Sequence, residues 1–138
     1  MEAKLTYVSG MKFVGEASSG HAIVVDGERE HGGDNVGLRP SELLLIAIGG
    51  CSAMDVISIM KKKKQHITSF EINVNGNKVD THPKKFDKIV VEYVFKGKDI
   101  SEEAVQRAVE LSMTKYCSVK ATLEGGVPIE YTYKVINE

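Results

Sequence analysis

One long apolar segment constrains the fold of this chain more than any other feature. Residues 43–60 contain a single charged side chain, Asp55, and are apolar on nearly every side of a helix. Pro40 and Ser41 stand just before them, and proline suits the first turn of a helix while serine can cap its free amides. In a soluble protein, a helix that is apolar all round is enclosed on most sides. We therefore expect a long helix at the centre of the fold.

The same segment is just long enough to suggest a membrane span, and the lysines at 61–64 would suit its cytoplasmic end. Asp55 lies in the middle of the run, which argues against a span, and the strand-rich remainder of the chain needs a helix to pack on. The lysines are equally favoured by the carbonyl end of the helix dipole. We therefore expect a core helix and no membrane partner.

Strand patterns and turn residues occupy most of the remaining chain. Short β-rich runs separated by Gly and Ser predict hairpins, and Ser101 followed by two glutamates predicts a capped helix start. The expected order is strands at 4–8, 12–16 and 21–26, a polar loop at 27–37, the long helix, strands at 69–74 and 87–95, helices at 101–115 and 119–123, and a strand at 128–135. A chain of 138 residues is long enough for one core but not for two, so we expect a single α+β domain over residues 1–138.

Composition and the first residues argue against several classes of partner and compartment. The net charge of -1 at pH 7 gives no long-range field that would attract nucleic acid. Residues 1–4 lack the basic segment, apolar run and cleavage site of a secretory signal. Two cysteines are too few for a secreted disulfide scaffold. We expect a cytoplasmic protein without a nucleic-acid partner.

The two cysteines are the strongest candidates for chemistry. Cys51 follows Gly49 and Gly50 in the middle of the long helix, where glycines suggest that another backbone or a ligand approaches closely. A buried packing role for Cys51 is equally open, because cysteine is among the most buried residue types. Cys117 follows one expected helix and precedes another, and a helix N-terminus stabilises a thiolate. A buried thiol and a second thiol at a helix start suggest peroxidatic and resolving roles, in which a sulfenic acid on the first condenses with the second.

Spacing does not predict a metal site. Cys51 and Cys117 are far apart in the sequence, and neither has a Cys or His at ligand spacing. Asp55 lies one helical turn after Cys51 and would raise the thiol pKa if it were close. We therefore expect Asp55 to act as a cap, to lie at an interface or to pair with a cation. A Cys-His hydrolase is formally open, but the sequence selects no particular histidine.

The chain resembles the OsmC/Ohr family over nearly its whole length. The resemblance rests on Arg39-Pro40-Ser41-Glu42-Leu43-Leu44 leading to Gly49-Gly50-Cys51, on Cys117-Ser118-Val119-Lys120-Ala121-Thr122, and on the closing strand. The motif Gly-Gly-Cys-Ser-Ala-Met-Asp is similar to the form of this motif in the OsmC-like branch that is sometimes called YhfA-like.

The resemblance implies both a fold and an activity. It implies an OsmC-like α+β fold, in which antiparallel sheets from both chains of an intertwined homodimer wrap around the long central helices. Active sites then lie at the dimer interface, with Cys51 as the peroxidatic thiol and Cys117 as the resolving thiol. The implied substrate is a small organic hydroperoxide, reduced without metal, flavin or haem at the expense of a thiol reductant.

Two positions depart from the peroxidases of this family. Those proteins use an arginine in the N-terminal strand region, where the hairpin at 10–20 offers only Lys12, and lysine lacks the planar fork of arginine. They also hold that arginine with a glutamate directly after the proline, where this chain has Ser41 and Glu42 comes one residue later. Lys12, Arg39 and Glu42 are therefore the candidates for supporting residues. An ordinary exposed charge at a helix start is the simpler interpretation of Arg39 and Glu42.

The paired cysteines favour a thiol-dependent peroxidase that reduces organic hydroperoxides in defence against oxidative stress. The missing arginine and glutamate favour two alternatives. One is a non-catalytic OsmC-like protein that binds a small apolar ligand at the dimer interface, and the other is a slow thiol redox sensor.

Overall fold

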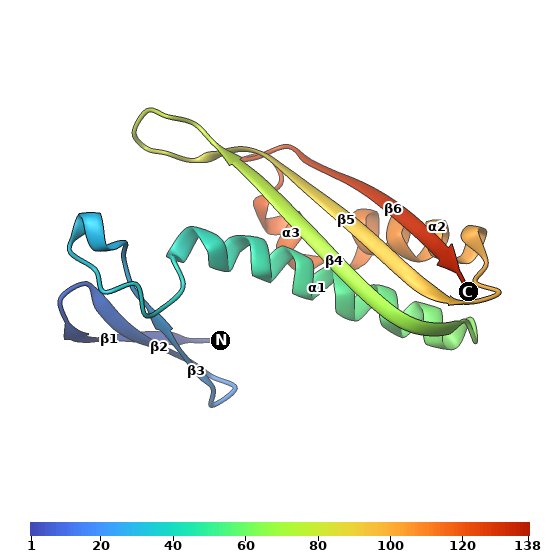
Figure 1. Ribbon diagram of the computed structural model, residues 1–138, viewed down its shortest axis with the longest axis horizontal. Helices are drawn as coiled ribbons and strands as arrows, with labels where there is room; N and C mark the ends of the chain where they lie inside the picture. Colours follow the sequence, from blue (N-terminus) through green and yellow to red (C-terminus); the bar gives the residue numbers. More distant parts are fainter. The chain divides into compact units, whose positions relative to one another are not determined.

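The computed structural model describes all 138 residues, and they form two compact units, residues 1–44 and residues 45–138 (Figure 1). The long helix begins in the first unit and continues into the second. Each unit is described by itself below.

The first unit contains the predicted three-stranded meander. Its sheet has the order β1-β2-β3, with both pairs antiparallel. Glycine allows the tight turn at Gly10, where φ is +56°. The strands are β1 (Ala3–Ser9), β2 (Lys12–Ala17) and β3 (Ala22–Val25).

The polar loop after β3 is organised by one buried carboxylate. Asp26 is 3% exposed and accepts hydrogen bonds from the amides of Gly27, Asp34 and Val36. Burial by itself raises the pKa of Asp26, but these hydrogen bonds outweigh it and hold the pKa below its usual range. A short 3-10 turn, η1 (Arg29–His31), lies within the loop. The loop is therefore built around Asp26.

Helix α1 (Pro40–Lys62) begins where the proline and serine predict. The Glu42 carboxylate accepts a hydrogen bond from the backbone N–H of Arg39 at 2.8 Å, which satisfies a free amide at the helix start. Lys61 and Lys62 occupy the last turn, as the dipole argument predicts.

The second unit holds a three-stranded sheet with the order β4-β5-β6. Its strands are β4 (His66–Lys78), β5 (Phe86–Lys98) and β6 (Ile129–Asn137). The predicted hairpin is confirmed by the antiparallel pairing of β4 and β5, and it is longer than the sequence pattern indicated. β6 instead pairs parallel to β5, which corrects the expectation of purely antiparallel sheets. The reason is the helical connection between β5 and β6, which returns the chain to the end of the sheet where β5 began.

That connection consists of three short helical segments. They are α2 (Glu102–Leu111), the π-helical turn η2 (Ser112–Tyr116) and α3 (Ser118–Leu123). The predicted cap is confirmed, since the Ser101 hydroxyl accepts a hydrogen bond from the amide of Ala104. Cys117 separates η2 from α3, as the sequence predicts.

The core of the second unit lies between the sheet and the helices (Figure 1). Alternate residues of β5 point into it, as expected of a strand with one covered face. Its largest fully buried side chains include Tyr93, Phe95, Ile48, Met60, Ile89 and Met113.

Helix α1 is buried on one face only in the single chain. Ile48, Val56 and Met60 are fully buried, whereas Ile46 is 55% and Met54 is 73% exposed. The expectation of a helix enclosed on most sides therefore does not hold within one chain. An exposed apolar stripe on a long helix is typical of a surface that another protein covers.

Candidate active site

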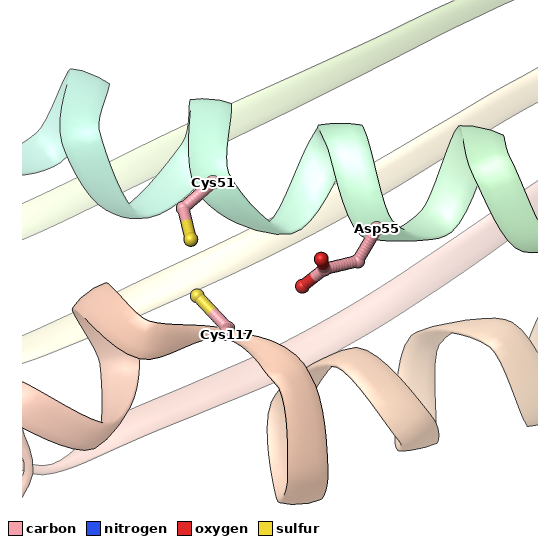
Figure 2. Close-up of side chains that lie close together, drawn as sticks. All are labelled: Cys51, Asp55 and Cys117. Carbon is pink, nitrogen blue, oxygen red and sulfur yellow. The ribbon is translucent and has the colours of Figure 1, made fainter.

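The structure brings the two cysteines together although they are far apart in the sequence. Cys51 lies in the middle of α1, and Cys117 lies between η2 and α3. Their sulfur atoms lie within 4.8 Å of each other and point toward one another, with the Asp55 carboxylate beside them (Figure 2). Both thiols are free. The site is thus a reduced dithiol with one carboxylate.

The backbone around Cys117 explains how its side chain reaches Cys51. The π-helical turn closes with a hydrogen bond from the Cys117 N–H to the Ser112 carbonyl at 2.8 Å. Cys117 then leaves the helical conformation, with φ -71° and ψ 101°, and becomes the N-cap of α3. Its sulfur accepts a hydrogen bond from the amide of Lys120 at 3.4 Å. The widened turn therefore aims Cys117 at α1.

Close packing explains one of the two glycines that precede Cys51. A Cβ on Gly49 would lie 2.9 Å from a methyl group of Val74 in β4, so only glycine lets the strand approach α1 at this point. A Cβ on Gly50 would meet nothing within 4 Å. The group that approaches Gly49 is a side-chain methyl group, where we expected a backbone or a ligand, and no group approaches Gly50.

Hydrogen bonds make Cys51 the more acidic thiol of the pair. Burial by itself raises the pKa of Cys51, but the backbone N–H of Val119, the Ser118 hydroxyl and the Cys117 thiol all hydrogen-bond to its sulfur and together lower that pKa below its usual range. The Ser118 oxygen lies 3.7 Å from the sulfur. The first amides of α3 therefore stabilise a thiolate on Cys51.

Cys117 behaves in the opposite way. Its side chain is buried, and burial raises the pKa of Cys117 to about 11, although the Lys120 amide acts against the change. The neighbouring Cys51 and Asp55 raise it further. We expected the helix start to favour a thiolate on Cys117 itself. That expectation is wrong, because the free amides of the helix start act mainly on Cys51 across the gap.

Asp55 lies beside both sulfurs, and its hydrogen-bond partner is a hydroxyl group; of the three roles expected for it, the pairing with a cation is not found. The Ser112 hydroxyl donates to its carboxylate at 2.9 Å. Ser112 also bonds Ser52 at 2.7 Å, and Ser52 bonds the phenol of Tyr93. Burial raises the pKa of Tyr93, so the phenol keeps its proton. A continuous row of buried hydroxyl groups thus ends on Asp55.

Two clusters hold groups that a metal ion could use. The ligand atoms of Cys51, Asp55 and Cys117 all lie within 4.8 Å of one another, and two thiols with a carboxylate suit a thiophilic ion such as Zn²⁺. A structural zinc site needs a fourth protein ligand, which this cluster does not supply. The other cluster, Glu28, Glu30 and His31, consists of exposed side chains.

The three candidate supporting residues belong to the first unit and have partners of their own there. Lys12 forms an ion pair with Asp34. Arg39 donates to the Gly37 carbonyl at 2.9 Å and to the Asn35 side chain at 2.7 Å. Glu42 caps the start of α1 by accepting the backbone N–H of Arg39.

The fold and the paired thiols define a class: an α+β dithiol protein of the OsmC type. The chain belongs to the OsmC-like protein family, whose model matches residues 32–132. It is 40% identical to protein YhfA of Escherichia coli K12, over 99% of this chain and 98% of that protein.

Solved structures agree with this assignment. A hypothetical protein from Aquifex aeolicus is 36% identical, with a TM-score of 0.80 over 97% of this chain and 96% of that one. The organic hydroperoxide resistance protein OhrB of Bacillus subtilis has the same fold at 20% identity, with a TM-score of 0.64 over 97% of this chain and 98% of that one. The resemblance inferred from the sequence motifs is therefore confirmed.

Proposed function

We propose that this protein is a thiol-dependent peroxidase that reduces organic hydroperoxides. The observation that carries the proposal is the pairing of two adjacent thiols of opposite acidity, a Cys51 whose pKa is lowered and a Cys117 whose pKa is raised. The thiolate is the nucleophile in such chemistry, so the more acidic thiol attacks first.

The reaction has two steps. The Cys51 thiolate attacks one peroxide oxygen, the O–O bond breaks, and the departing alkoxide takes a proton to become an alcohol. Cys51 is then a sulfenic acid, and Cys117 condenses with it to form a disulfide and water. A dithiol reductant reduces the disulfide by exchange and restores both thiols. No step calls for a metal, flavin or haem.

The family supports the proposal in a general way. Its solved structures include organic hydroperoxide resistance proteins from Legionella pneumophila and Bacillus subtilis. Their identity to this chain is 16% and 20%, so they share its fold, and the activity in their names comes to this chain only as part of the proposal.

The proposed function also involves a domain, an oligomeric state, a compartment and supporting residues. We propose one OsmC-like domain over residues 1–138 that works as a homodimer in the cytoplasm, since the family model matches parts of both units. Lys12, Arg39 and Glu42 are the proposed supporting residues. In the dimer, Lys12 or Arg39 would supply the cation that the family's arginine supplies elsewhere, and Glu42 would hold it in place.

Steady-state turnover tests this function. The measurement compares loss of cumene hydroperoxide and of hydrogen peroxide, with dithiothreitol as reductant, for wild type, Cys51→Ser and Cys117→Ser. We expect fast loss of the organic peroxide that disappears in Cys51→Ser. Unchanged peroxide loss in Cys51→Ser would rule the function out.

One observation favours a second candidate function. The cation nearest in sequence to the family's missing arginine, Lys12, is already engaged by Asp34. A protein without that cation could hold a small apolar ligand at the dimer interface, or could oxidise slowly as a sensor. A ligand retained in native mass spectra of the fresh dimer, together with inert thiols, would support the binding protein. Stoichiometric oxidation with slow turnover would support the sensor.

A further inference from the structure

Asp55 lies beside the two sulfur atoms and has no part in the reaction proposed above. It lies one helical turn after Cys51 on α1, and its carboxylate reaches toward both thiols (Figure 2). A carboxylate oxygen of Asp55 lies within 4.8 Å of each sulfur. The residue is half-buried, whereas most aspartates lie exposed on a surface.

The hydrogen bonds in the row of hydroxyl groups behind Asp55 all donate toward the carboxylate. Ser112 donates its proton to Oδ2 of Asp55, so it must accept from Ser52, and Ser52 must in turn accept from Tyr93. Each hydroxyl donates its one proton to the next group on the way to the carboxylate. This arrangement holds the Asp55 side chain in place. Hydrogen bonds from the protein reach Oδ2 only, which leaves Oδ1 able to accept a proton.

The titratable groups around the carboxylate are few. Cys51 shares its helix, Cys117 faces it from the start of α3, and Tyr93 lies at the far end of the hydroxyl row on β5. Tyr131 of β6 acts electrostatically on Tyr93. None of these groups is a cation, and Tyr93 keeps its proton. Asp55 is therefore the carboxylate base nearest to Cys117.

Disulfide formation requires such a base. Cys117 attacks as a thiolate, but burial raises the pKa of Cys117 to about 11, so the thiolate is scarce at neutral pH. The oxygen that leaves Cys51 needs a proton at the same moment, because hydroxide is a poor leaving group. A single group close to both sulfur atoms can take the proton from Cys117 and give a proton to the oxygen that leaves Cys51.

We propose that Asp55 relays a proton from the Cys117 thiol to the oxygen that leaves Cys51, an inference that rests on the proposed peroxidase function. As the Cys117 sulfur attacks the Cys51 sulfenic acid, the S–S bond forms and the S–O bond breaks, with its electron pair staying on oxygen. The carboxylate takes the Cys117 proton and passes it to that oxygen. One sulfenic acid and one thiol thus become one disulfide and one water, with no further oxidant or reductant.

This role is compatible with the low pKa of Cys51. A carboxylate near a reactive thiol opposes its ionisation, yet the pKa of Cys51 stays low, since the hydrogen bonds at its sulfur outweigh the burial that raises it. Asp55 instead acts on Cys117, whose pKa it raises together with burial and Cys51. Its task belongs to the second step of the reaction and not to the first.

A single-turnover experiment with the full-length protein tests the relay. Reduced protein is mixed with one equivalent of cumene hydroperoxide, the sulfenic acid is captured with dimedone, and the disulfide is followed by mass spectrometry. Asp55→Asn should form the sulfenic acid at about the wild-type rate, and should form the disulfide roughly 100-fold more slowly at neutral pH or worse, as is common for loss of general acid–base catalysis. Asp80→Asn, which changes an exposed carboxylate, is the matched control.

The pH dependence separates a relay from a merely structural role. Without the carboxylate, hydroxide must remove the Cys117 proton, so disulfide formation in Asp55→Asn should recover as the pH rises. Asp55→Glu keeps a carboxylate and should stay closer to wild type, which also covers the case that Asp55→Asn folds poorly. A wild-type rate of disulfide formation in Asp55→Asn, or a slow rate that high pH does not restore, would overturn the relay. A wild-type protein that forms no sulfenic acid would overturn the peroxidase function, and the relay with it.

Discussion

Cys51 owes its acidity to groups that lie on another element of the fold. The side chain sits in the middle of α1, away from the free amides of its own helix. The amides of Ser118 and Val119, together with the Ser118 hydroxyl, come from the start of α3. Free amides at a helix start stabilise an anion wherever they point. The reactive thiol and the helix start that activates it thus belong to different segments of the chain.

The Ser118 hydroxyl should set part of this acidity. In Ser118→Ala the pKa of Cys51 should rise, because one of the hydrogen bonds that oppose its burial is lost while the amide bonds remain. Less thiolate is then present at neutral pH, so alkylation of Cys51 by iodoacetamide, followed by peptide mass spectrometry, should shift to higher pH. Thr122→Ala removes a hydroxyl from the same helix, one that bonds the Ser118 carbonyl at 2.8 Å, and serves as control. An identical alkylation profile for Ser118→Ala and wild type would contradict this account.

Among the elements, α1 and β4 come into close contact at Gly49. Gly49→Ala should destabilise the fold by about 1–3 kcal/mol through overpacking, although alanine favours a helix by roughly 1 kcal/mol over glycine. The clash is with one methyl group of Val74. In a Val74→Ala background the same substitution should therefore be neutral or stabilising. Urea unfolding of the four proteins measures this, and an equal cost in both backgrounds would show that the contact is not the cause.

Local patterns in the sequence predict most of these elements. The apolar run, Pro40 and Ser101 locate α1 and α2, and turn residues locate the strands. The direction of β6 could not be predicted, because no local pattern distinguishes a parallel from an antiparallel partner. The π-helical turn at 112–116 also escaped prediction, since it adds one residue to an otherwise helical pattern.

The same limit applies to the site. Both cysteines were identified from their sequence context, and their meeting depends on a long-range contact that spacing does not encode. The hydroxyl partner of Asp55 was not predicted for this reason, because Ser112 lies on a distant segment and Ser52 and Tyr93 are reached only through it. A serine next to a reactive cysteine was the only local sign of the hydroxyl row.

At the scale of the whole molecule, the exposed apolar stripe on α1 is the surface through which we expect the chain to bind a partner. Ile46 and Met54 are large apolar side chains that lie more than half exposed on the helix that carries Cys51. Burial of such side chains is worth about 1.5–3 kcal/mol each. We therefore expect two copies of the chain to associate through this stripe, as the family resemblance implies.

A charge on the stripe should separate the two copies. Met54→Glu should raise the Kd of the dimer by about a hundredfold or more, because a buried and unpaired carboxylate costs on the order of 3 kcal/mol. Analytical ultracentrifugation measures the change, and Lys84→Glu, at an exposed position in the loop between β4 and β5, is the control. A wild-type chain that sediments as a monomer at all concentrations would contradict the expectation.

The central claim is that Cys51 and Cys117 act together as peroxidatic and resolving thiols. Intact and peptide mass spectrometry of the reduced protein after one equivalent of cumene hydroperoxide tests it most directly. The account predicts a loss of two hydrogens with a Cys51–Cys117 crosslink in wild type, and in Cys117→Ser a gain of one oxygen on Cys51. Two free thiols in wild type, with the peroxide unconsumed, would contradict it.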